Sequence, residues 1–132
     1  MTGVALNSVS DGTPATWELP ALAAVQLVHD IAQNTKVDLV VAESFVPRPG
    51  VKTWQPDAIE VVGALRYMCY SQDITFELQS ATNAKKFSTD AKLKRLEWYI
   101  PTTGGHANDA LRHLLLAMVK HDQINLSRIG ES

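Results

Sequence analysis

Acidic and imidazole side chains occur in two segments of the sequence where they could act together. Glu43 follows the apolar run of residues 36–42, and His106 and Asp109 are spaced H-x-x-D at the start of a helical pattern. Open α/β sheets bind ligands where their strands end, and the H-x-x-D spacing puts both side chains on one face of a helical turn. Carboxylates with one imidazole suit Mg²⁺ or Mn²⁺, so these three residues are candidate metal ligands.

Each of these residues also has an ordinary structural interpretation. Glu43 can be a solvated acid that ends a strand, because charged side chains are usually exposed. Asp109 can be an acid of the first helical turn, where the helix dipole favours negative charge. His113 lies on the same helical face as His106 and Asp109, seven residues after His106. Cys69, mid-helix on an apolar face, is interpreted as a core residue rather than as a ligand.

A second chemical feature is a concentration of positive charge. One interpretation is a patch that contacts phosphates, and the alternative is a solvated helix face. A Pro/Gly loop further upstream carries two more cations and a tryptophan that could stack on an unpaired base. The basic stretch contains Lys85, Lys86, Lys92, Lys94 and Arg95, and the loop contains Arg48, Lys52 and Trp54.

The size and composition of the chain indicate one globular domain. The sequence has 132 residues, of which 45% are apolar, and a formal net charge of −2. We therefore expect a single domain over residues 1–120 with a polar, frayed tail over 121–132. No apolar run is long enough to span a membrane and no signal peptide is evident, so no membrane association is expected. A single cysteine is compatible with a reducing cytoplasm.

The hydrophobic patterning predicts an α/β domain with a mixed sheet flanked by helices. We expect the second helix to bury Ile59, Val62, Leu65, Met68 and Cys69, and the last helix to bury Ala110, Leu111, Leu114, Leu115 and Met118. The strand at 36–42 should be buried on both faces, because it is a continuous β-branched run. The predicted elements are a hairpin of strands 4–9 and 15–19, a helix at 21–33, a strand at 36–42, a helix at 56–71, a strand at 74–78, a mostly helical stretch at 84–98 and a helix at 107–120.

Several short motifs, in this order, resemble those of the RuvC-type Holliday-junction resolvases. The similarity is greatest to the small versions carried by bacteriophages of actinobacteria, and it covers essentially the whole chain. The combination of the strand-ending Glu43 with the sequence GGHANDALRHLLL is more specific than either alone. The motifs are Thr2-Gly3-Val4-Ala5-Leu6, Val41-Ala42-Glu43, Lys85-Lys86-Phe87, Lys92 and Gly105-His106-Ala107-Asn108-Asp109-Ala110.

The resemblance implies an RNase H-like fold and a two-metal nuclease that cuts branched DNA in the host cytoplasm. It implies that Glu43, His106 and Asp109 hold Mg²⁺ or Mn²⁺, and that Lys85 and Lys92 contact DNA near the scissile phosphate. The charge pattern would add Lys86, Arg48 and Lys52 to this DNA-binding surface. The helix at 56–71 would form the contact of a homodimer, which would place two sites on opposed strands of a junction.

The chain departs from this family at its first strand. Family members open with a buried strand that ends in Asp-Pro-Gly, a few residues before the Thr-Gly found here as Thr2-Gly3. Without that strand, residues 4–9 and 36–42 would each have an unpaired edge. We favour an internal methionine at Met1 as the explanation, and the alternative is a natural chain that is inactive or completed by another group.

The sequence therefore predicts a metal-dependent, structure-specific endodeoxyribonuclease that cleaves Holliday junctions or other branched DNA. Two alternatives stay open. One is a DNA-junction binding protein whose metal site is incomplete, and the other is a less selective flap or single-strand nuclease.

Overall fold

A computed structural model gives the fold of residues 1–7, 12–44, 56–101 and 105–130, which are the residues described below. The predicted helices and strands are all present within a few residues of their expected bounds. In chain order the elements are β1 (Thr2–Leu6), β2 (Ala15–Leu19), α1 (Ala21–Asn34), β3 (Leu39–Ser44), α2 (Pro56–Ser71), β4 (Thr75–Ser80), α3 (Ala81–Phe87), α4 (Asp90–Arg95), α5 (His106–Lys120) and the 3₁₀ helix η1 (Leu126–Ile129).

The strands form two separate pairs. β1 and β2 are an antiparallel hairpin in which Val4 faces Trp17, and β3 and β4 are a parallel pair in which Glu43 faces Gln79. In the described ranges each strand has a single strand neighbour. The α/β class is confirmed, but the expected continuous mixed sheet is replaced by two pairs. Within the described ranges, β1 and β3 therefore each have one edge without a strand partner, as expected, whereas residues 8 and 9 of the predicted first strand lie outside these ranges.

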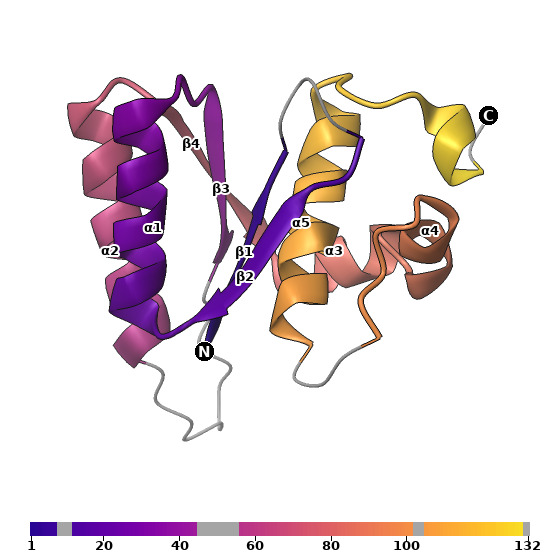
Figure 1. Ribbon diagram of the computed structural model, residues 1–132, viewed down its shortest axis with the longest axis horizontal. Coiled ribbons are helices and arrows are strands. Elements are labelled where there is room, and N and C mark those ends of the chain that lie inside the picture. Colours follow the sequence, from indigo (N-terminus) through magenta and orange to yellow (C-terminus); the bar gives the residue numbers. More distant parts are fainter. Residues whose placement is uncertain (8–11, 45–55, 102–104, 131–132) are drawn as a thin grey trace.

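The helices enclose the strands from two sides (Figure 1). α1 and α2 pack on each other, and α2 also packs on β3 and β4. On the other side, α5 contacts β1, β2 and β3, so it touches both strand pairs through several residues. Within the described ranges, no helix combines the length and apolar character needed to cross a membrane.

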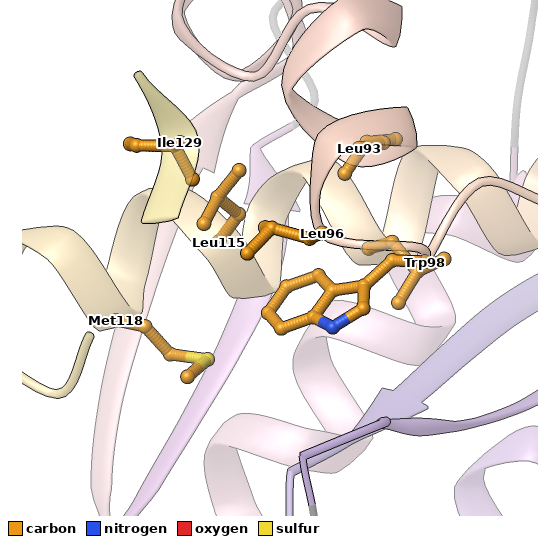
Figure 2. Packing of buried hydrophobic residues seen from close by; sticks show 7 residues of the cluster. Leu93, Leu96, Trp98, Leu115, Met118 and Ile129 are labelled. Carbon is orange, nitrogen blue, oxygen red and sulfur yellow. The ribbon is translucent and has the colours of Figure 1, made fainter. Parts of the chain in front are cut away.

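The buried apolar residues form two clusters rather than one. The larger cluster joins α5 to α4, to the segment that follows α4 and to η1 (Figure 2). The smaller one lies between α2 and β3. The larger cluster contains Leu93, Leu96, Trp98, Leu111, Leu115, Met118 and Ile129, and the smaller contains Ala42, Leu65, Met68 and Cys69.

β3 differs from the expected strand in position and in burial. It runs from Leu39 to Ser44, whereas the sequence pattern predicts a strand over 36–42 that ends at Glu43. Only Ala42 is buried, and the other side chains are half-buried or exposed. Two strands are too few to be covered completely, so the prediction of burial on both faces is wrong.

The two long helices bury somewhat different residues from those expected. In α2, Leu65, Met68 and Cys69 are buried, but Ile59 is 46% exposed. In α5, Leu111, Leu115 and Met118 are buried as predicted, whereas Ala110 and Leu114 are only half-buried. Helical spacing identifies an apolar side of a helix, but the neighbouring elements decide how far along the helix that side is covered.

The basic stretch forms two short helices because two hydroxyl residues separate them. The Thr89 side chain accepts a hydrogen bond from the Lys92 backbone N–H and caps α4. The Ser88 hydroxyl donates instead to the Arg112 carbonyl oxygen of α5, at 2.8 Å. Thr89 therefore caps α4, and Ser88 joins α3 to α5.

The segment after α5 is packed rather than frayed. Asn125 caps η1 by accepting a hydrogen bond from the Ser127 backbone N–H. Ile129 is buried among the residues of the larger cluster, next to α4. The segment is polar, but the expectation that it is frayed is wrong for residues 121–130, because Ile129 and the partly buried Ile124 pack on the larger cluster.

Candidate functional site

Three polar side chains meet where α5 crosses the parallel strand pair. Glu43 and Gln79 are register partners on β3 and β4, so their side chains lie side by side on one face. His113 of α5 contacts both of them: its Nε2 lies 3.2 Å from Glu43 Oε1, and its Nδ1 lies 3.0 Å from Gln79 Oε1. We call these three residues the Glu43 cluster.

The Glu43 cluster combines a buried base with an accessible acid. His113 and Gln79 are buried, whereas the Glu43 side chain is 54% exposed. The hydrogen bond from His113 lowers the pKa of the Glu43 carboxyl below its usual value of 4.5, against the opposing effect of burial. The positive charges of His113 and Lys85 lower this pKa further. The cluster therefore presents a carboxylate to solvent near the end of a parallel strand.

The ring of His113 is held at both nitrogens. Each nitrogen faces an oxygen atom, and the ring can donate to both oxygens only when it carries two protons. The Gln79 Nε2 atom is buried without a hydrogen-bond partner in the described ranges. An unpartnered buried donor is costly, so such groups are few in folded proteins.

The first turn of α5 is fixed by contacts with the hairpin. The Glu18 carboxylate accepts a hydrogen bond from the Ala107 backbone N–H at 2.9 Å, which satisfies a free N–H of the helix terminus. Gly3 of β1 lies directly against the backbone of His106, so closely that a Cβ at position 3 would overlap it. His106 itself is exposed at the start of the helix. β1 and β2 therefore determine where this turn lies.

Asp109 faces a cation on its own helix. Its Oδ1 lies 3.6 Å from Arg112 Nε, a separation of three residues. The Arg112 guanidinium also donates to Asp90 Oδ1 at 2.7 Å and to the Ser88 carbonyl oxygen at 3.0 Å. Arg112 thus joins α5 to α3 and α4, and it holds a positive charge beside the Asp109 carboxylate.

The predicted metal ligands are not gathered into one cluster. Across the ranges with a described structure, no three His, Cys, Asp or Glu side chains lie close enough together to hold a metal ion. Glu43 contacts His113, Asp109 contacts Arg112, and His106 is exposed at the start of α5. The strand-end acid does face the helix that carries the H-x-x-D motif, but it meets that helix one turn after Asp109.

The predicted DNA-binding cations lie in different surroundings. Lys85 is near enough to Glu43 to affect its pKa. Lys92 donates to the Phe87 carbonyl oxygen at 2.8 Å, and its Nζ lies 3.9 Å from the centre of the Phe87 ring. Lys94 lies over the ring of Tyr99 instead. The loop residues Arg48, Lys52 and Trp54 fall outside the described residues.

Sequence reasoning missed His113 and Gln79 as members of the site. A sequence signal existed for His113, because it repeats the helical face of His106 and Asp109 after two turns. No local pattern indicates Gln79. Its role depends on the parallel register that places it beside Glu43.

The lowered pKa of Glu43 predicts a specific pH dependence of stability. Because the folded-state pKa lies below the unfolded one, this carboxylate stabilises the fold above pH 4.5, and the contribution is lost as pH falls through the folded-state pKa. The Glu43→Gln variant lacks this titration. We expect urea unfolding to show a smaller loss of unfolding free energy in the variant than in the wild type as the pH is lowered from 6 to 3. Equal losses would show that the His113 contact does not stabilise the fold.

Comparison with known proteins gives no match. No protein-family model, no curated protein and no solved structure matches this chain significantly.

Proposed function

We propose that this chain is an RNase H-like endonuclease that cuts Holliday junctions or other branched DNA, with Mg²⁺ or Mn²⁺ as its cofactor. Glu43, His106 and Asp109 are the proposed catalytic and metal-ligating residues. Lys85, Lys86 and Lys92 are the proposed DNA-binding residues of the described ranges. The proposal rests on the resemblance of the motifs to RuvC-type resolvases and on the geometry of the Glu43 cluster.

The observation that supports the proposal most is the contact between Glu43 and His113. It brings an ionised, accessible carboxylate at the end of a parallel strand against the helix that carries His106 and Asp109. The end of a parallel strand is a common ligand position in α/β proteins. Lys85 adds positive charge near this carboxylate, as a phosphate-binding site requires.

The donor types suit a hard divalent cation, but their arrangement does not form a site for one. Two carboxylates and one imidazole are suitable ligands for Mg²⁺ or Mn²⁺. In the described ranges these three residues do not form a three-ligand group, and Glu43 is engaged by His113. The metal requirement is therefore tested directly, by comparing cleavage in Mg²⁺, in Mn²⁺ and in chelator.

The proposed homodimer is supported by the surface of α2. Ile59, Tyr67 and Tyr70 are large, exposed apolar or aromatic side chains on this helix. Their spacing places them along one side of α2, with Gly63 between them. Grouped exposed apolar side chains often mark interaction surfaces, and a symmetric dimer would cover the same side of α2 in both copies.

A second candidate function is junction binding without cleavage. The observation that favours it is the lack of a three-ligand group for a metal ion in the described part of the chain. A binding protein would need the lysines of α3 and α4 but not an assembled catalytic site.

One assay distinguishes the nuclease from the junction-binding protein. A labelled four-way junction is incubated with the wild-type chain in Mg²⁺, in Mn²⁺ and in chelator, beside the Glu43→Gln variant, after circular dichroism has shown that both are folded. Metal-dependent cutting that the variant lacks supports the nuclease, and sedimentation of the same sample tests the dimer. Binding of the junction without cutting in either metal supports the second candidate.

A further inference from the structure

A groove beside the Glu43 cluster has a composition suited to a polyanion. It lies between β4, α3, α4 and α5 and has a volume of about 760 Å³. Three lysines line it, namely Lys86 of α3, Lys92 of α4 and Lys120 of α5, and none of the lining residues is acidic. We call it the lysine groove. It concentrates positive charge on a chain whose net charge is −2.

The floor of the lysine groove is apolar. Leu78 of β4 is 41% exposed there, and Leu116 and Val119 of α5 are half-buried beside it. Exposed apolar surface next to cations suits a ligand that has both anionic groups and flat apolar faces. A single nucleic-acid strand has both, because its bases are not hidden in a duplex stack.

The lysine groove adjoins the candidate site through one residue. Gln79 lines the groove, and its Oε1 lies 3.0 Å from the His113 ring that contacts Glu43. Lys85, which affects the pKa of Glu43, is the sequence neighbour of Lys86. A strand held in the groove would therefore pass next to the Glu43 carboxylate.

The lysines that line the groove are not the same set as the cations of the basic stretch. The groove includes Lys120, which is far from that stretch, and does not include Lys94. Lys94 lies over the Tyr99 ring at 4.7 Å. Lys120 forms an ion pair with Glu77 at 3.7 Å, but its side chain is 63% exposed, so the pair contributes little and Lys120 can reach a ligand.

From this arrangement we propose that the lysine groove binds the sugar–phosphate backbone of a single DNA strand that leads to the Glu43 cluster. Lys86, Lys92 and Lys120 contact phosphates, and the apolar floor contacts sugars and bases. The inference deepens the proposed nuclease function, because it names the part of a branched substrate that is held next to the site.

The test measures binding of a labelled oligothymidine in chelator, where no metal-dependent cutting occurs, as a function of salt. The groove variant is Lys86→Gln/Lys120→Gln, and the matched control is Lys36→Gln/Lys94→Gln, which removes two charges outside the groove. Lys92 is left unchanged, because its side chain donates a hydrogen bond to the Phe87 carbonyl oxygen and its loss would also remove this contact. We expect the groove variant to lose about 1.4 from the slope of log K against log salt, about 0.7 for each phosphate contact, and the control to keep the wild-type slope.

Three outcomes would overturn the inference. The first is an equal change of slope in both variants, which would indicate a general charge effect. The second is an unchanged slope in the groove variant. The third is tighter binding of an oligoglutamate peptide than of oligothymidine, lost in the groove variant, which would indicate an acidic protein segment as the ligand. The junction-cutting assay is a separate readout, so a failure of the nuclease proposal is distinguished from a failure of the lysine groove.

Discussion

The Asp109→Asn variant is expected to lose at least about 10-fold in the rate of metal-dependent junction cutting, while junction binding changes little. Asparagine has nearly the same shape and fits the first turn of α5, but it removes the negative charge that the proposed nuclease needs there. Losing a residue that hydrogen-bonds a metal ligand lowers metal affinity or activity by about 10–100-fold. Losing the ligand itself should lower it at least as much. The measurement is the cleavage rate of a labelled four-way junction in Mg²⁺ at saturating protein, with binding measured separately in chelator.

The Asp90→Asn variant is the matched control for this prediction. Asp90 and Asp109 both face Arg112, with Asp90 at the shorter distance of 2.7 Å. If the role of Asp109 were only to pair with Arg112, the Asp90 variant would lose as much activity. We expect Asp90→Asn to cut at close to the wild-type rate. Cutting by Asp109→Asn at the wild-type rate would remove Asp109 from the mechanism.

The second large effect is expected from Gly3→Ala, which should lower the free energy of unfolding by about 1–3 kcal/mol. A Cβ at position 3 would overlap the His106 carbonyl oxygen and lie 3.1 Å from the Ala107 backbone nitrogen. These are backbone atoms, so the contact can be relieved only by moving β1 away from α5. Urea unfolding of the wild type and the variant measures the loss.

Gly12→Ala is the control, because Gly12 belongs to the same hairpin and an added Cβ there meets nothing within 4 Å. We expect this variant to be unchanged or more stable by a few tenths of a kcal/mol, since alanine reduces the entropy of the unfolded chain. Gly3→Ala should also lower the cutting rate, because the displaced turn carries His106. Equal stability of the two variants would mean that the contact between β1 and α5 does not position this turn.

The secondary structure was largely predictable because its signals are local. Pro20 stands at the N-terminus of α1, Thr89 caps α4, and apolar spacing gives α2 and α5 their bounds to within one residue. Caps and helical periodicity act over a few residues of the chain, so they can be read directly from the sequence.

The burial of individual residues was less predictable. Ile59 belongs to the apolar pattern of α2 and is nevertheless exposed, whereas Ile129 stands in a polar segment and is buried. Both outcomes depend on which element lies opposite the side chain. That information is carried by contacts between residues distant in sequence, which hydrophobic periodicity does not contain.

Some features of the candidate site were also predictable from the sequence, and others depend on tertiary packing. The position of Glu43 after an apolar run makes it a candidate ligand, the H-x-x-D spacing puts His106 and Asp109 on one helix, and the basic stretch near residues 85–95 is evident from the sequence. These features are properties of single segments. The partner of Glu43 is not, because His113 reaches it only through the packing of α5 across β3 and β4.

The parallel register of β3 and β4 sets Gln79 beside Glu43, and the packing of α3, α4 and α5 brings Lys86, Lys92 and Lys120 to one groove. No sequence spacing relates these residues, since they come from elements separated by turns and other helices. A side chain's type is fixed by the sequence at its own position, whereas its neighbours, its charge environment and its exposure arise from packing over the whole chain.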